Sequence, residues 1–313
     1  AVIWPNIVRP SASSRRNSSN VAHRGTRCAL AIRTRGASWS GRLVSAEKLV
    51  SDFLFRRVSS EIAVFSEAGR ISRELAERVL SNEVIIPGRT TIEETGWWLK
   101  DRLEERNLAS SFGLPNVYIT GPDGIEPSAP DRIIQRGDLV MIDWGVGLMG
   151  YYSDMKRIAY VRKPGETAVP AGIQNAFDRA RKARDVIVKS LRTGRTGAET
   201  LAGVNGALEK AGFHVMKEFN KTEATDKTQV ICCAHPVANW GHGIGPSLAF
   251  FQVKQQSFVL QPQMFMSVEL FAYTANPDWG GKLTRIPLED DAVVTDHGVE
   301  WIYPVNDRIL VIR

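Results

Sequence analysis

The chain has 313 residues, of which 43% are hydrophobic and 24% charged, proportions typical of a globular protein with a substantial core. No run approaches the ~18 apolar residues of a membrane-spanning helix, so we expect no membrane partner. The three cysteines are a poor basis for a disulfide framework, which favours a reducing compartment and a cytoplasmic protein.

The formal charge of +6 comes from the first 42 residues. They contain eight arginines and no acidic residue, so removing these arginines from the 40 basic residues leaves 32 against 34 acidic ones. A nucleic-acid-binding body would itself be basic, and this one is not, so no nucleic-acid partner is expected. Residues 1–42 are rich in serine and arginine without an apolar period, which predicts a disordered or truncated segment before a folded domain over residues 43–313.

Helices and short strands are predicted to alternate in a fixed order in the first half of this domain. A helix with apolar residues at helical spacing begins near Ser59 and ends before the turn at Pro87-Gly88. An amphipathic helix over residues 91–105 follows. Extended segments are then predicted over residues 116–120, 138–143 and 151–161.

The second half repeats this order. Helices are predicted over residues 173–191 and 198–211, and strands over residues 265–271, 288–294 and 309–312. Gly194-Arg195-Thr196 repeats Gly88-Arg89-Thr90, and each motif precedes an acidic residue and a helix. This pattern indicates an internal duplication of a large unit, with a site in the cleft between two similar halves.

Four acidic residues occur in or beside apolar strands. Asp143 ends an apolar run, Asp154 begins the next strand, Glu269 lies inside a very apolar segment, and Glu289 opens another. In the internal repeat Asp143 corresponds to Glu269 and Asp154 to Glu289, which predicts that all four converge. Buried carboxylates need a partner or a cation. For the two aspartates a role in capping the turns near Gly145 and Gly150 remains an alternative.

A histidine stands between glycines in Gly241-His242-Gly243. Flanking glycines allow close approach of the backbone and leave the imidazole accessible. One imidazole among carboxylates favours Mn²⁺, Co²⁺ or Zn²⁺ over Mg²⁺, with Fe²⁺ also compatible. We therefore expect divalent metal ions at these residues, Mn²⁺ first among them.

At these residues the sequence resembles the pita-bread metallopeptidases, which include methionine aminopeptidase, Xaa-Pro aminopeptidase and prolidase, with creatinase as a relative. The resemblance is closest to the Xaa-Pro branch and spans residues 43–313. It implies a catalytic domain with an α+β pita-bread fold, whose two similar halves are related by pseudo-twofold symmetry around a metal cleft. The matching segments are Met141–Gly145, Gly150–Arg157, Gly241–Gly245, Val268-Glu269 and Leu288–Val294, with Ser45–Ile62 resembling the entry to such a domain.

The resemblance also implies roles for the five residues. Asp143 would bind one metal, Asp154 and Glu289 would bridge both, and His242 and Glu269 would complete the other. Two such metals, about 3.5–4 Å apart, polarise a scissile carbonyl and activate water, with Glu269 as the proton shuttle. The implied function is that of a dinuclear metal-dependent hydrolase, an aminopeptidase or dipeptidase of Xaa-Pro type acting on small peptides.

The sequence departs from the family pattern where peptide-cleaving relatives carry two further histidines. Ser128 and Ala249 stand at those positions, which puts ordinary aminopeptidase activity in doubt. His235 is a candidate catalytic replacement, although it could instead cap the turn at Pro236. Trp240 and Trp279 are candidate substrate contacts.

Two other functions stay open on these grounds. One is a non-peptidase C–N hydrolase of the same fold, like creatinase, and the other is a non-catalytic metal-binding relative. A homodimer is left open as well.

Overall fold

The computed structural model describes residues 44–313, apart from residues 128, 220 and 239–241. Residues 50–313 form one compact unit. The expectation for residues 1–42 lies outside the described residues. None of the helices in the described part of the chain is long and apolar enough to cross a membrane.

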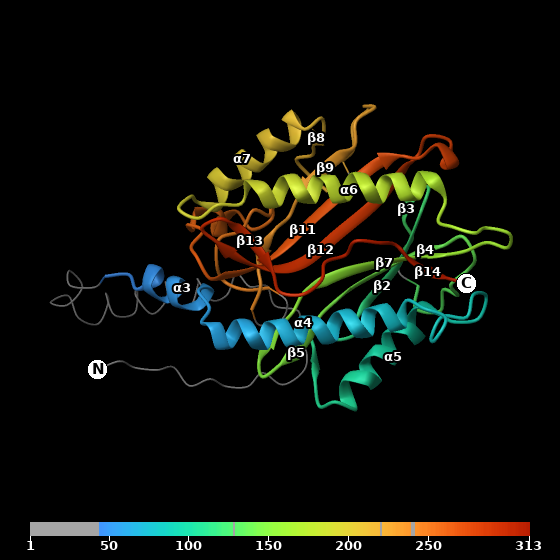
Figure 1. Cartoon of the computed structure of the whole chain (residues 1–313), viewed down its shortest axis with the longest axis horizontal. Helices are drawn as coiled ribbons and strands as arrows, with labels where there is room; N and C mark the ends of the chain where they lie inside the picture. Colours follow the sequence, from blue (N-terminus) through green and yellow to red (C-terminus); the bar gives the residue numbers. More distant parts are fainter. Residues whose placement is uncertain (1–43, 128, 220, 239–241) are drawn as a thin grey trace, which may run out of the picture. The chain divides into compact units, whose positions relative to one another are not determined.

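The helices of the larger unit follow the predicted order (Figure 1). After α3 (Glu47–Phe55) they are α4 (Ser59–Val79), α5 (Ile92–Glu104), α6 (Ala171–Ser190) and α7 (Gly197–Lys210). The predictions for α5, α6 and α7 are confirmed to within two residues at each end, because apolar periodicity and end signals are local properties of the sequence.

The same N-cap begins α5 and α7. Thr91 Oγ1 accepts a hydrogen bond from the Glu94 backbone N–H at 3.1 Å, and the Glu94 carboxylate accepts one from the Thr91 N–H at 2.7 Å. Thr196 and Glu199 repeat this capping box at 3.2 and 2.9 Å. The glycines of the two Gly-Arg-Thr motifs have φ angles of 81° and 84°, a left-handed conformation that favours glycine. The repeated motif is thus a helix start used once in each half.

Among the described residues, eleven strands form one mixed sheet with the order β3-β2-β4-β7-β12-β11-β9-β8 along its main path. β10 pairs with β11, β13 with β12 and β14 with β7, while β1, β5 and β6 form a separate small sheet. The strands are β1 (Ala109–Ser110), β2 (Asn116–Gly121), β3 (Gly124–Ile125), β4 (Leu139–Trp144), β5 (Val146–Leu148), β6 (Tyr151–Tyr152), β7 (Met155–Val161), β8 (His214–Val215), β9 (Gln229–Cys232), β10 (His235–Pro236), β11 (Met264–Ala275), β12 (Leu283–Thr295), β13 (Gly298–Trp301) and β14 (Leu310–Ile312), with short 3-10 helices η1 (Val253–Ser257) and η2 (Pro277–Trp279).

Each half packs its helices against its own strands. In the first half, apolar side chains of α4 and α5 such as Leu75 and Leu99 form a buried cluster with Ile142 of β4. In the second half, α6 packs on β11 and β12, with Phe177 and Leu270 in another buried cluster. This arrangement confirms the predicted α+β class. Because helices and neighbouring segments cover the long strands, the charged side chains on those strands are held away from solvent.

The two halves meet in the middle of the sheet, where β7 pairs with β12. Lys156 of β7 lies opposite Glu289 of β12, and also opposite Asp143 of the adjacent strand β4. Glu269 of β11 lies opposite Glu289 on its other side. Directly opposed residues of antiparallel strands point to the same side of the sheet. One row across four strands therefore carries Asp143, Lys156, Glu289 and Glu269 on one face.

Candidate metal centre

This row forms the floor of a cavity of about 310 Å³. The floor carries the charged and imidazole groups, and the walls are mainly aromatic. The lining residues are Phe112, Asn116, Asp143, Asp154, Lys156, Phe219, His235, His242, Phe251, Glu269, Phe271 and Glu289. The structure thus brings together the five predicted metal ligands and His235, and it adds Lys156 to them.

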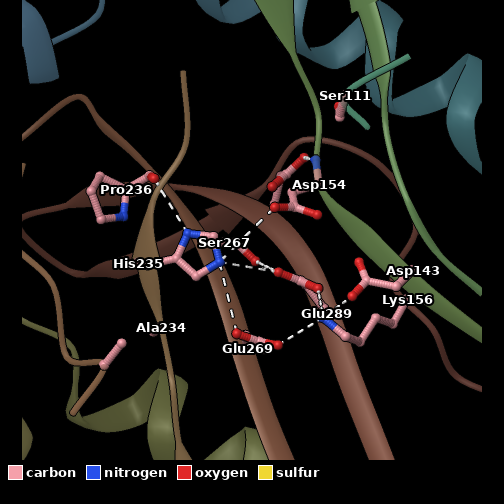
Figure 2. A network of polar contacts seen from close by, with 12 residues as sticks. Ser111, Asp143, Asp154, Lys156, Ala234, His235, Pro236, Ser267, Glu269 and Glu289 are labelled. Atoms are coloured by element: carbon pink, nitrogen blue, oxygen red, sulfur yellow. Dashed lines mark hydrogen bonds and ion pairs between the residues drawn. The ribbon is translucent and has the colours of Figure 1, made fainter. Parts of the chain in front are cut away.

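Lys156 lies in the middle of the acidic row (Figure 2). Its Nζ is 2.7 Å from Glu269 Oε1 and 3.1 Å from Asp143 Oδ2, and it also forms an ion pair with Glu289 Oε2. The side chain is almost completely buried. One ammonium group is therefore shared by three carboxylates from three different strands.

His235 approaches the same carboxylates from the other side. It lies on β10, opposite Ser267 of β11, and is 1% exposed. Its Nε2 is 3.3 Å from Glu289 Oε1, 3.8 Å from Glu269 Oε2 and 4.0 Å from Asp154 Oδ2. His235 therefore points Nε2 into the cluster, while its Nδ1 contacts the Pro236 carbonyl oxygen.

His242 completes this side of the cluster at the exposed end of the cavity. Its ring centroid is 4.3 Å from that of His235. One ligand atom each from Asp154, His235 and His242 lie within 4.8 Å of one another, and the same holds for His235, Glu269 and Glu289. Two imidazoles and several carboxylates thus surround one small volume.

The distances between His235 Nε2 and its carboxylate neighbours match those between ligand atoms bound to one divalent ion. Ligand atoms about 2.1 Å from one ion lie about 3–4 Å from each other, as the Nε2 of His235 lies from its three carboxylate neighbours. Asp154 is 1% exposed, and its Oδ1 has no hydrogen-bond partner, an unfavourable state for a buried oxygen unless a cation binds it. The donor set on the histidine side therefore fits a divalent ion.

Neighbouring groups hold the carboxylates in place. Ser267 donates a hydrogen bond to Glu289 Oε1 at 2.7 Å, and Tyr118 donates one to Asp143 Oδ2 at 3.3 Å. The backbone N–H of Asp154 donates to Asp291 Oδ2 at 2.9 Å. Such contacts orient ligand side chains before a cation binds, which raises affinity for it.

Burial and charge move the pKa values of the row in opposite directions. Burial raises the pKa of Glu269 to about 7, although Lys156 opposes this shift. Burial acts in the same sense on Glu289, but Lys156 and His235 outweigh it and hold the pKa of Glu289 below its ordinary value. Burial would lower the pKa of Lys156, yet the surrounding carboxylates raise it well above the usual range. The ammonium stays charged, and Glu269 is the glutamate that accepts a proton more readily.

Only two of four further residues of interest lie in the described part of the chain: one of the two predicted substrate contacts and one of the two positions where relatives carry histidine. Trp240 and Ser128 lie outside the described residues. Trp279, in η2, packs against the large core cluster beside α6 and does not line the cavity, so its placement lends no support to substrate contact. Ala249 is buried in an apolar cluster with Cys233 and Phe271.

Lys156 is the functional residue that the sequence analysis missed. Asp154 immediately precedes β7 and Lys156 is the second residue of that strand; in extended chain, side chains two apart point to the same face. That spacing could have placed its side chain beside the predicted ligands. The aromatic walls carried no comparable signal, because Phe219 and Phe251 lie outside helices and strands, where no periodic pattern predicts which way a side chain points.

The comparisons with known proteins agree with this geometry. Metallopeptidase family M24 matches residues 63–296 of the chain. The Bacillus subtilis peptidase YqhT is 24% identical over 279 residues, covering 86% of this chain and 68% of that protein. A Xaa-Pro dipeptidase from Pyrococcus furiosus is 22% identical over 271 residues, covering 84% and 67%.

Solved structures show the same fold. The X-Pro aminopeptidase from Thermotoga maritima matches with a TM-score of 0.63 at 18% identity, over 84% of this chain and 65% of that one. The chain thus spans about two thirds of the length of these relatives. The predicted pita-bread fold is confirmed, and so is the resemblance from which it was inferred. With the family match extending over most of its length, the chain belongs to metallopeptidase family M24.

Proposed function

We propose that this protein is a metal-dependent hydrolase that cleaves a small peptide or related amide, with Xaa-Pro dipeptides as the first substrates to test. The observation that carries the proposal is the floor of carboxylates and imidazoles in a cavity with aromatic walls. Such a floor can bind a cation and a polar amide group, while the walls accept an apolar group of the same ligand.

The size and lining of the cavity favour a small substrate. Its volume of about 310 Å³ lies at the lower end of small-molecule sites, which suits a dipeptide better than a long chain. Phe271 packs edge to face against Phe219, with ring centroids 5.0 Å apart, and both line the cavity. An apolar ring such as that of proline would find aromatic partners there.

The cofactor in this proposal is a divalent cation, with Mn²⁺ preferred and Co²⁺, Zn²⁺ or Fe²⁺ as alternatives, because the donor set mixes carboxylates with imidazoles. When bound, such an ion supplies Lewis-acid polarisation of a substrate carbonyl and makes water more acidic. Asp154, His242 and Glu289 would hold it, with Asp143 and Glu269 as the other predicted ligands. How many ions the centre takes depends on Lys156.

Glu269 is the proposed proton acceptor for the attacking water and donor to the leaving amine. Its carboxylate lines the cavity, and its side chain bridges the two sides of the cluster, 2.7 Å from Lys156 Nζ and 3.8 Å from His235 Nε2. His235 was also predicted to be catalytic. Its contacts with three carboxylates place it among potential metal ligands, so a direct contact with substrate stays a prediction.

The test is turnover of a dipeptide panel by the purified chain with Mn²⁺, Co²⁺ or Zn²⁺, comparing Xaa-Pro dipeptides with matched dipeptides that lack proline. Glu269→Gln should fold and lower kcat by about 10²-fold or more, the usual loss for a general acid–base group. Glu209→Gln, an identical change at an exposed position of α7, is the matched control and should leave kcat unchanged. Activity in which Glu269→Gln equals the wild type would contradict the mechanism.

A second candidate function is favoured by one observation. Lys156 fills part of the acidic row with an ammonium group, and a centre altered in this way suits a metal-binding protein without turnover. The same panel separates the candidates: binding of metal without cleavage of any dipeptide or amide favours the second. Cleavage of non-peptide amides alone would instead indicate a C–N hydrolase that does not act on peptides.

A further inference from the structure

The two glutamates of the row divide their oxygens between two positions. Glu289 directs Oε2 to the Lys156 ammonium and Oε1 to His235, at 3.3 Å. Glu269 directs Oε1 to the ammonium at 2.7 Å and leaves Oε2 3.8 Å from His235. In Figure 2 Glu289 accordingly lies between the lysine and the histidine. Carboxylates that share their oxygens in this way bridge two cation positions.

The first position is already filled. The Lys156 Nζ lies among oxygens of Asp143, Glu269 and Glu289, close enough to each that a metal bonded to the same oxygens would overlap the ammonium. The lysine comes from β7, whose residues are all buried, and it is paired with Asp143 on one side and Glu289 on the other. Its stem therefore has little freedom to move aside for an ion.

The second position, on the histidine side, gathers candidate ligand atoms. His235 Nδ1 lies 3.3 Å from the Pro236 carbonyl oxygen. On its other side Nε2 faces Glu289 Oε1, and ligand atoms of Asp154, His235 and His242 lie within 4.8 Å of one another. Asp154 directs Oδ2 toward the same imidazole, 4.0 Å from Nε2, and its other oxygen, Oδ1, is buried without a hydrogen-bond partner. A cation bound beside Asp154 would satisfy both the gathered donor atoms and the unpartnered carboxylate oxygen.

We propose that this centre takes a single divalent cation, held by Asp154, His235, His242 and Glu289, and that the Lys156 ammonium permanently occupies the second cation position. The inference rests on the proposed function only in that the centre binds a divalent ion. It revises the two ions predicted from the sequence to one, because the residue that follows Asp154 by two positions supplies a positive charge of its own.

The experiment counts ions in the full-length chain. The protein is stripped with a chelator, titrated with Mn²⁺ in a calorimeter, desalted, and its metal content measured. One ion per chain is expected, with the electron paramagnetic resonance spectrum of an isolated Mn²⁺. Two ions per chain with the spectrum of a coupled pair, or no bound ion, would overturn the proposal.

A variant at Lys156 tests the cause of this stoichiometry. Lys156→Ala opens the first position and should raise the content to two ions per chain with a coupled spectrum. Lys210→Ala, a change of the same type at an exposed site on α7, should keep one ion. A Lys156→Ala protein that folds in Mn²⁺ and still binds one ion contradicts the role assigned to the ammonium.

Asp154→Ala decides the matter if Lys156→Ala does not fold, because it leaves the contacts of the ammonium intact. It should lose the single ion, and retention of a full equivalent would overturn the proposal. Turnover is measured on the same samples. A protein that binds one ion but cleaves nothing upholds this inference and fails the proposed function, whereas an active protein with two ions does the reverse.

Discussion

Two buried ion-pair clusters occupy opposite sides of the same two strands. Lys156 of β7 and Glu289 of β12 face the cavity. The next residue on each strand, Arg157 and Asp290, points to the other side and forms an ion pair at 2.8 Å. The alternation of side chains along a strand is what separates the clusters.

The two clusters differ in their balance of charge. On the closed side Asp290 faces two guanidinium groups, Arg157 at 2.8 Å and Arg184 at 3.6 Å, and accepts a hydrogen bond from the Asn306 backbone at 2.9 Å. On the cavity side one ammonium serves three carboxylates, with Asp154 nearby. In the Asp290 cluster the positively charged side chains outnumber the carboxylates, so we assign this cluster a structural role. The excess of acids at the cavity identifies a place for a further cation.

The largest expected effect on stability comes from the closed cluster. Asp290→Asn leaves two buried guanidinium groups without their carboxylate, so we expect a loss of about 3–5 kcal/mol in the free energy of unfolding. Glu289→Gln is the corresponding change at the cavity. It should cost clearly less in metal-free protein, because Lys156 keeps two other carboxylates. Urea unfolding followed by circular dichroism measures both, and a larger loss for Glu289→Gln would invert the comparison.

A smaller effect should follow from adding metal. With free Mn²⁺ at about 100 times its Kd, linkage predicts about 2.7 kcal/mol of added stability for the wild type. Asp290→Asn should gain a similar increment from its lower starting point, because its cavity ligands are intact. Glu289→Gln should lose most of the gain. Unfolding with Mn²⁺ or with EDTA measures the increments, and equal gains in all three proteins would place the stabilising ion outside this centre.

The smallest expected loss of stability comes from the helix N-caps, which lie away from both ion-pair clusters, one in each half. Thr91→Ala and Thr196→Ala each remove one N-cap hydrogen bond, which should cost about 1 kcal/mol in the free energy of unfolding. The two losses should be similar and should add in the double variant, because the caps share no partner. Metal content should not change. A cost confined to one variant would mean that the two repeats do not contribute equally to stability.

Much of this protein follows from local sequence. The helices and most long strands are confirmed near their predicted bounds, because periodicity, glycine turns and capping boxes depend on residues close in the chain. The five predicted ligands do come together, since buried carboxylates in apolar strands have few stable alternatives to convergence. Assigning a separate role to Lys156 from sequence was harder, because a lysine in a strand is ordinarily a solvent-facing residue.

The tertiary structure decided which side chains meet in the metal centre. Lys156 contacts Glu269 and Glu289 across 113 and 133 positions of the chain, and only the pairing of β7 with β12 brings these residues into one row. The same long-range packing turns His235 towards the carboxylates and places Trp279 against the core cluster beside α6. The sequence by itself determined which residue types could bind a cation, through short-range patterns of polarity. The register between distant strands decided that one of those cations is the protein's own lysine.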